Sequence, residues 1–326
     1  MTTPEDKIDP QIHAQILNED IIPQYGLRTK VSHARPKVII LCGQPGAGKG
    51  NISEAAEAEF ADDVVVIDAD ELRRFHPRID QHQSANPYTW SDLTHADASQ
   101  WAKELRKAAF KEKNNIIIDT TLSHGQASVK LIKELQADYE VEVRVVAAHR
   151  LESELGVDQR FTRGIDDSGR GRYVPVSARK EIYDAIPVTL DAIHAQTDAR
   201  IRIYSREGNE LWDRQTAKPG HKPGKVLKEA RNARLRDAEN VRKLTRRYQD
   251  QIDWHNALPG KIVGNPKITA DAAQRLLEER AKLRVVDDLK NGACRVAQIE
   301  NSMRSGLQQS STGNVRASRS SGISLG

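Results

Sequence analysis

Five short runs rich in β-branched residues alternate with stretches of helical periodicity, and this alternation limits the folds open to the chain. The runs are VIILC, VVVID, NIIIDTT, EVRVVAAHR and IRIYSR, at residues 38–42, 64–68, 115–121, 142–150 and 201–206. Strands that are almost continuously apolar are buried on both faces, as in a parallel sheet covered by helices on each side. We therefore predict an α/β fold of that kind, with its active crevice at the carboxyl ends of the strands.

Charged residues are distributed unevenly along the 326-residue chain. Residues 1–215 carry 28 Lys and Arg against 35 Asp and Glu, whereas the remaining residues carry 22 against 11. A stretch rich in Pro, Gly and Lys separates the two parts. We predict a domain over residues 1–215, a linker over 216–225, a basic, mainly helical extension over 226–301 and a disordered tail over 302–326.

The sequence has none of the usual features of a membrane or secreted protein. It is 38% hydrophobic and 29% charged, and no apolar run is long enough to cross a bilayer. The first residues are acidic and polar, without the basic and then apolar pattern of a signal peptide. The two cysteines, Cys42 and Cys294, make no metal or disulfide framework. We expect a cytoplasmic protein.

A phosphate-binding loop is predicted at residues 43–50, which read GQPGAGKG. The loop follows an apolar strand and precedes a helical stretch, the context in which the pattern G-x-x-x-x-G-K is informative. Backbone N–H groups and the positive end of the helix dipole would bind phosphates, and Lys49 would reach the β and γ oxygens. The predicted ATP-binding residues are Gly43, Gln44, Pro45, Gly46, Ala47, Gly48, Lys49, Gly50 and Asn51.

Gly50 stands where this pattern usually has the Ser or Thr that binds Mg²⁺. Asn51 can offer a carbonyl oxygen to the metal or to a water bound to it, and a strand-end carboxylate can take a larger share. Asp119 and Asn51 are thus the candidate ligands, largely through water. A weakened metal site is the alternative.

Two carboxylates follow the second apolar run, in the sequence VVVIDADELRRFHP. A strand that ends in Asp68 and Asp70 would deliver acidic oxygens to the crevice where the γ-phosphate lies. One of them could accept the proton of an attacking hydroxyl. The alternative is an acidic turn that caps a helix beginning at Glu71.

Seven segments follow one another in the order found in the zeta toxin family of bacterial toxin–antitoxin kinases. They are GQPGAGKG, IDADELRRFHP, THADASQWAKEL, IIIDTT, SELGVDQRF, GRYVP and YSREGNELWD, and the chain resembles the family from about Asp6 to Asp213. The resemblance implies a P-loop kinase-like fold that uses ATP and Mg²⁺ to phosphorylate a sugar hydroxyl of UDP-N-acetylglucosamine. It also implies a cognate antitoxin that blocks the nucleotide site. A different acceptor, such as a dinucleotide, is the nearest alternative.

The resemblance also implies roles for individual residues. Asp70 would be the base, Asp119 with Thr121 would bind the sugar nucleotide, and Arg160 and Arg172 would be the two lid arginines. Family members usually have Glu-Gly-Thr where this chain has Asp-Thr-Thr, so a shorter acid faces the acceptor. Guanidinium groups suit such a lid on physical grounds, because phosphoryl transfer spreads negative charge over the moving group.

Other residues near these motifs receive structural interpretations. Arg163 and Arg170 are expected on a basic surface, His76 and His95 in hydrogen bonds, and Trp101 in packing. The basic second part leaves another class of function open, a nucleic-acid or partner-binding protein with a regulatory nucleotide site. Interleaved acidic residues and a lack of aromatic residues in that part count against it.

Overall fold

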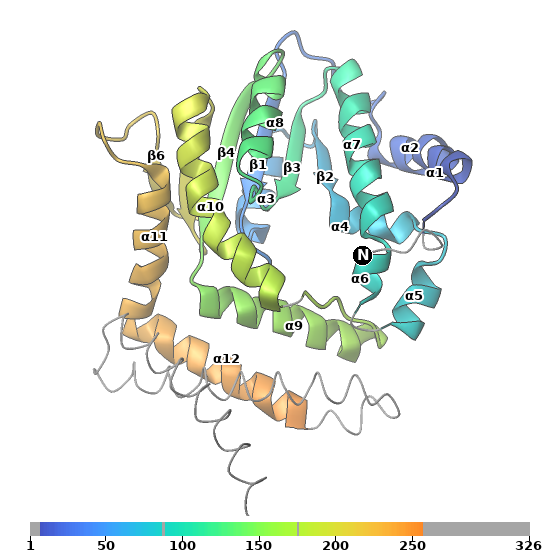
Figure 1. Ribbon diagram of the computed structural model, residues 1–326. Helices are drawn as coiled ribbons and strands as arrows, with labels where there is room; N and C mark the ends of the chain where they lie inside the picture. Colours follow the sequence, from blue (N-terminus) through green and yellow to red (C-terminus); the bar gives the residue numbers. More distant parts are fainter. Residues whose placement is uncertain (1–6, 87–88, 175, 257–326) are drawn as a thin grey trace, which may run out of the picture. The chain divides into compact units, whose positions relative to one another are not determined.

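The computed structural model describes residues 7–86, 89–174 and 176–256, and a six-stranded sheet forms its core (Figure 1). The strands are β1 Lys37–Cys42, β2 Val65–Asp68, β3 Ile116–Thr120, β4 Glu140–Ala147, β5 Arg200–Ser205 and β6 Glu210–Asp213. Their order is β2-β3-β1-β4-β5-β6, in which β6 alone pairs antiparallel with its neighbour. The predicted α/β fold with a mainly parallel sheet is confirmed.

Helices connect the strands, and several of them flank the sheet. The α-helices of the described residues are α1 Pro10–Ile16, α2 Ile22–Tyr25, α3 Gly50–Ala58, α4 Ala69–Leu72, α5 Ile79–Ala85, α6 Trp90–Leu93, α7 His95–Lys111, α8 Gln126–Gln136, α9 Arg150–Ser168, α10 Val176–Gln196, α11 Pro223–Ala233 and α12 Ala238–Asn256. None of these described helices combines the length and apolar character needed to span a bilayer.

The fourth strand is shorter than the sequence predicts. It ends at Ala147, and the residues up to Arg150 lead into α9 instead. His149 caps this helix by accepting the Leu151 N–H, while Glu152 accepts the His149 N–H at 3.0 Å. This capping box gives the backbone a helical start that ends the strand.

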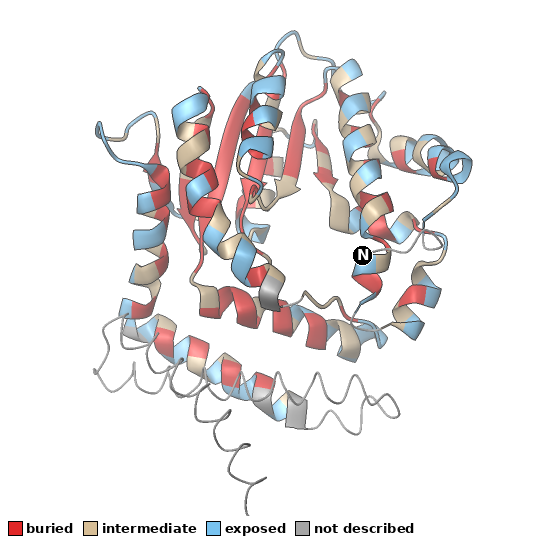
Figure 2. Ribbon diagram, viewed as in Figure 1, coloured by how far each residue is buried: buried red, intermediate tan, exposed pale blue. Residues whose placement is uncertain are grey.

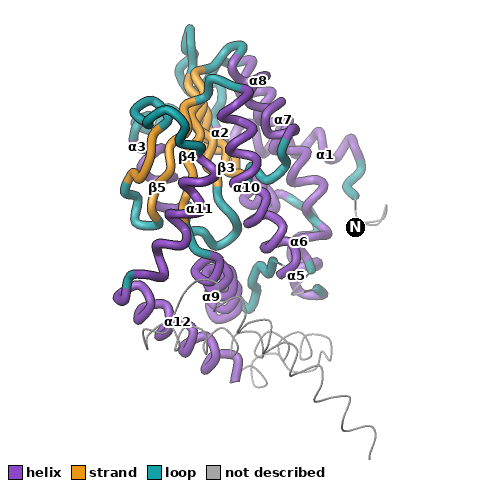
Figure 3. The backbone as a smooth tube through the Cα atoms, turned by 60° about the vertical axis from the view of Figure 1, so that its left-hand side comes forward, coloured by secondary structure: helices purple, strands orange, loops and turns teal. Residues whose placement is uncertain are grey.

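Both faces of the sheet are buried under helices. Ile40 of β1 belongs to one buried cluster with Trp101 of α7 and Ile132 of α8. Ile39, the next residue, belongs to another cluster with Ile52 of α3. Figure 3 shows the corresponding layers, with α3 on one side of the strands and α7, α8 and α10 on the other, and Figure 2 shows the buried strands. The runs are rich in apolar β-branched residues because helices cover both faces of the sheet.

The described contacts divide the chain into two compact units, residues 1–231 and 232–326. Most of α11 lies in the first unit, where the backbone N–H of Gly224 donates to Asp191 Oδ1 of α10 at 2.8 Å. The linker expected at residues 216–225 stays a prediction. Much of the expected basic extension, and the whole expected tail, lie outside the described residues.

A network of charged side chains lies on β4 and its neighbours. Glu142 is 1% exposed and accepts a hydrogen bond of 2.7 Å from Arg144 Nε. Arg202 Nη1 donates to the same oxygen at 3.2 Å, and Lys37 Nζ lies 3.0 Å from the other. Arg144 and Arg202 are register partners on adjacent strands, so this carboxylate compensates two like charges placed side by side. Burial would raise the pKa of Glu142, but Arg144 and Lys37 lower it to about 2.

We predict that Glu142→Gln lowers the free energy of unfolding at pH 7 by about 3 kcal/mol, because Arg144, Arg202 and Lys37 lose the buried carboxylate that they share. The pKa of Glu142 is depressed from 4.5 to about 2, so its contribution is complete above pH 4.5 and disappears as the pH falls toward 2. Urea unfolding at pH 7 and across the acid range measures this, with the exposed Glu140→Gln as control. A loss of equal size at every pH would contradict the assignment.

Candidate active site

The phosphate loop follows β1 directly and leads into α3, whose N-cap is Lys49. Gly46 has a φ of 76° and lies against α9, where an added Cβ would overlap the backbone carbonyl of Ser153. An added Cβ at Gly50 meets nothing within 4 Å. Glycine is therefore required at position 46, whereas position 50 has room for a side chain.

Parallel register brings two carboxylates together beside this loop. Asp68, the last residue of β2, is the register partner of Asp119 in β3. Lys49 Nζ forms an ion pair with Asp119 and lies 3.4 Å from the Thr120 carbonyl oxygen. Burial raises the pKa of Asp119; the charge of Lys49 opposes that rise, and the charge of Asp68 adds to it. The loop lysine thus lies against the acidic end of the sheet.

Asp70 lies in the first turn of α4, immediately after β2. Its backbone N–H donates to Asp68 Oδ1 at 2.8 Å, so Asp68 caps α4, which begins at Ala69 and not at Glu71 as the alternative interpretation of this acidic turn had it. The Asp70 carboxylate forms an ion pair with Arg172 and another, at 3.2 Å, with Arg73 Nε. The two acids therefore differ in role, since one fixes the turn and the other is held between guanidinium groups.

The two predicted lid arginines approach this acidic group differently. Arg172 contacts Asp70 directly, and burial lowers the pKa of Arg172. Arg160 is exposed on α9, and its charge acts on the strand-end carboxylates through space. Burial raises the pKa of Asp68, and the charges of Lys49, Arg172 and Arg160 oppose that rise. Cations from three separate segments thus converge on the end of β2.

The other predicted residues lie around this group. Asn51 Nδ2 donates to the Arg206 carbonyl at 3.0 Å, so this amide is held at the turn after β5. The Thr121 hydroxyl shares a hydrogen bond of 2.9 Å with the serine hydroxyl two residues on. Arg163 and Arg170 are both exposed. The structure therefore brings together the lysine, the acids and the lid arginines, but not Asn51.

Arg73 belongs to the site although it was not predicted from the sequence. It is 4% exposed, and besides Asp70 it contacts Thr94 Oγ1 at 2.9 Å and His95 Nδ1 at 3.3 Å. Its place three residues after Asp70 in a helical turn, which puts both on one face, is the signal that could have identified it.

Trp101, which the sequence predicts to be a packing residue, lies in the core with no exposed surface.

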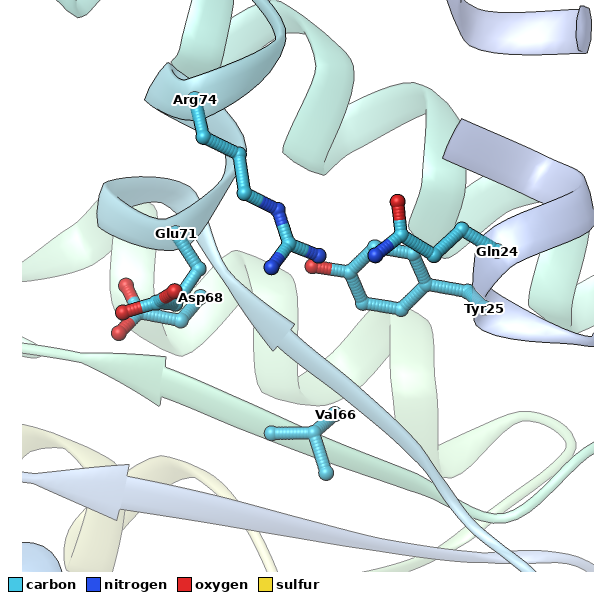
Figure 4. Close-up of a pocket in the computed structure, with 6 residues that line it drawn as sticks. All are labelled: Gln24, Tyr25, Val66, Asp68, Glu71 and Arg74. Carbon is cyan, nitrogen blue, oxygen red and sulfur yellow. The ribbon is translucent and has the colours of Figure 1, made fainter. Parts of the chain in front are cut away.

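A pocket of about 220 Å³ opens beside Asp68, next to the edge strand β2 (Figure 4). Its lining residues are Gln24, Tyr25, Val66, Asp68, Glu71 and Arg74. Figure 4 shows the Arg74 guanidinium directed at the hydroxyl end of Tyr25, and the carboxylates of Asp68 and Glu71 also line the pocket. Hydroxyl, carboxylate and guanidinium groups suit a polar ligand.

The residues present fit both a nucleotide and Mg²⁺. The glycine loop leads into a helix N-terminus, which offers backbone N–H groups and a positive dipole end to phosphates. Asp68 and Asp119 offer carboxylate oxygens, the ligand type that Mg²⁺ prefers. Mg²⁺ at such sites commonly has one or two carboxylates and completes its shell with water and phosphate oxygens.

Known proteins resemble this chain in sequence and in fold. The family model described as Zeta toxin matches residues 24–217. Toxin zeta of Streptococcus agalactiae is 27% identical over 245 residues, which cover 71% of this chain and 82% of that protein. Toxin PezT of Streptococcus pneumoniae serotype 4 is 30% identical over 193 residues, 57% of this chain and 75% of that protein. A structure from the PezAT chromosomal toxin–antitoxin system of Streptococcus pneumoniae superposes with a TM-score of 0.66 at 21% identity, covering 76% of this chain and 99% of that one.

We predict that Gly46→Ala weakens ATP binding by more than about tenfold, because the new Cβ overlaps backbone and the positive φ strains it. Gly50→Ala should bind as the wild type does, and Gly50→Ser should bind Mg²⁺-ATP equally well or more tightly. Calorimetric titration of each variant, after circular dichroism shows that it folds, measures this. Equal losses at positions 46 and 50 would contradict the loop geometry.

Proposed function

This chain belongs to the zeta toxin family, and from that premise we propose that it is an ATP- and Mg²⁺-dependent kinase of a small-molecule hydroxyl. The observation that carries the proposal is the approach of Lys49 to the end of a sheet where Asp70 and two arginines gather. By analogy with the family, we propose the sugar of UDP-N-acetylglucosamine or of a related nucleotide sugar as acceptor. A dinucleotide is the alternative acceptor.

Each part of the site has a task in this reaction. The loop amides and Lys49 would bind the β- and γ-phosphates, and Asp119 and Asp68 would hold Mg²⁺ partly through water. Bound Mg²⁺ would neutralise phosphate charge. Arg172 and Arg160 would stabilise the charge that spreads over the moving phosphoryl group.

Asp70 would act as the general base. The acceptor hydroxyl gives its proton to the Asp70 carboxylate, its oxygen bonds to the γ-phosphorus, and the bond to the β-phosphate oxygen breaks to release ADP. Arg73 and Arg172 hold this carboxylate from two directions, which fixes its orientation before the acceptor arrives. Arg73 would thus support the base while Arg172 also faces the phosphoryl group.

The acceptor would lie between Asp70 and Asp119, with Thr121 beside it. The pocket lined by Asp68 and Tyr25 would offer space for a further polar part of the acceptor (Figure 4). Because the resembling structure comes from a toxin–antitoxin system, we propose that an antitoxin protein covers the nucleotide site of this chain as well.

The alternative function in the basic second part gains no specific support from the described residues. In α12, Arg242 and Lys243 lie 2.7 and 3.5 Å from carboxylate oxygens of Glu239, so part of the positive charge is already compensated. Nucleic-acid or partner binding by the basic second part stays a prediction.

We predict that Lys49→Ala abolishes phosphate transfer and that Asp70→Asn strongly slows it, for different reasons. Lys49→Ala removes the charge on the β and γ oxygens and should weaken ATP binding strongly, whereas Asp70→Asn should keep ATP affinity and slow transfer by about 10²- to 10⁴-fold. The assay incubates the protein with ATP, Mg²⁺ and a panel of nucleotide sugars and dinucleotides, and detects a mass gain of one phosphate. Arg163→Ala, an exposed substitution outside the acidic group, is the control.

Transfer at the wild-type rate by Asp70→Asn would overturn the assigned mechanism, even if Lys49 proved essential. No transfer to any acceptor by the wild type, together with no ATP binding, would overturn the kinase proposal itself. Expression of the intact chain without an antitoxin should also slow bacterial growth, and both variants should relieve that effect.

A further inference from the structure

Helix α11 follows the residues that the family model matches, and one of its side chains reaches the phosphate loop. Arg231 is 1% exposed, and its Nη2 donates to Gln44 Oε1 in the loop at 2.8 Å. Its Nη1 donates to the Tyr183 carbonyl in α10 at 2.9 Å. The guanidinium also lies over the Tyr183 ring, 3.9 Å from the centroid. One buried arginine thus joins α10, α11 and the loop.

Gln44 is itself buried, and every group of its amide has a partner. It is 2% exposed, and Nε2 donates to the Ala148 carbonyl at 3.0 Å and to Ser153 Oγ at 2.6 Å. Arg231 can only donate and the Ala148 carbonyl can only accept, so the partners permit a single orientation of the amide. The Gln44 side chain therefore ties the loop to α9 on one side and to α11 on the other.

Arg231 is presented by an anchored helix. At the other end of α11, the Gly224 N–H binds Asp191, and an added Cβ at Gly224 would overlap the backbone carbonyl of Pro187. A buried guanidinium without hydrogen-bond partners is strongly destabilising, so this arrangement persists only while its acceptors stay in place. A loop held in this way loses less conformational entropy when phosphates bind.

We propose that Arg231 is a positioning residue of the nucleotide site, which fixes the phosphate loop through Gln44 and so makes α11 part of that site. The proposal relies on the proposed function only for the identity of the ligand as ATP. The order that it assigns to the loop does not depend on which ligand binds.

The test compares Arg231→Met, Arg231→Lys, Gln44→Leu and the double variant Gln44→Leu/Arg231→Met in the full chain. Lys225→Met is the matched control, since Lys225 lies on the same helix with a side chain that is 77% exposed. Hydrogen exchange of peptides covering residues 43–50 reports loop order, and calorimetry with ATP and Mg²⁺ reports affinity. Thermal unfolding separates these effects from general loss of stability.

Arg231→Met should increase loop exchange and weaken ATP binding about tenfold, the loss expected for one charge-assisted hydrogen bond. Arg231→Lys should recover part of that loss, and Lys225→Met should change neither readout. Because Arg231 acts through Gln44, the double variant should lose no more affinity than Gln44→Leu alone. If Arg231→Met fails to fold, Arg231→Lys and the double variant still decide the question.

Wild-type loop exchange and ATP affinity in a folded Arg231→Met protein would overturn the proposal, leaving Arg231 as a packing residue of α11. Additive losses in the double variant would overturn the route through Gln44. A wild-type chain that binds no ATP contradicts the proposed function instead, and loop exchange in the variants then tests Arg231 by itself.

Discussion

The parallel register of β2, β3 and β1 decides where chemistry can take place in this protein. Asp68 and Asp119 are register partners, and the phosphate loop begins where β1 ends, so three polar segments meet at one edge of the sheet. Apolar side chains fill both faces, and a shift of one residue would turn each of them to the opposite face. Because the register of the buried strands is fixed, the positions of the polar residues at their carboxyl ends are fixed as well.

The carboxylates that gather at that edge need nearby cations to compensate their negative charge. These cations come from segments far apart in the sequence. Lys49 comes from the loop, Arg73 from the turn after α4 and Arg172 from the segment before α10. Buried or half-buried charges remain stable only when they are paired, so each cation also restrains the segment that carries it. The same guanidinium groups that would meet a phosphoryl group therefore also help to hold the site in shape.

What could be predicted from the sequence was local. The β-branched runs and the glycine loop each occupy a few consecutive residues, and their order gives the sheet and the site around Lys49. Strand β6 reads ELWD and has no β-branched residue, and Pro187 inside α10 argues against the helix that forms there. The contact between Gln44 and Arg231 joins residues 187 positions apart, so no periodicity or motif could reveal it.

The phosphate-loop pattern leaves Gln44 and Gly50 equally unexplained, but the structure distinguishes them. Position 50 faces open space, so a side chain could be added there without displacing the backbone. The side chain at position 44 points into the protein, where it meets α9 and α11. The glycines and the lysine that the pattern specifies are those expected to bind phosphates. Gln44, at a position that the pattern leaves open, anchors the loop to the rest of this protein. A substitution at such a variable position would therefore be tolerated only together with a change in the helix that contacts it.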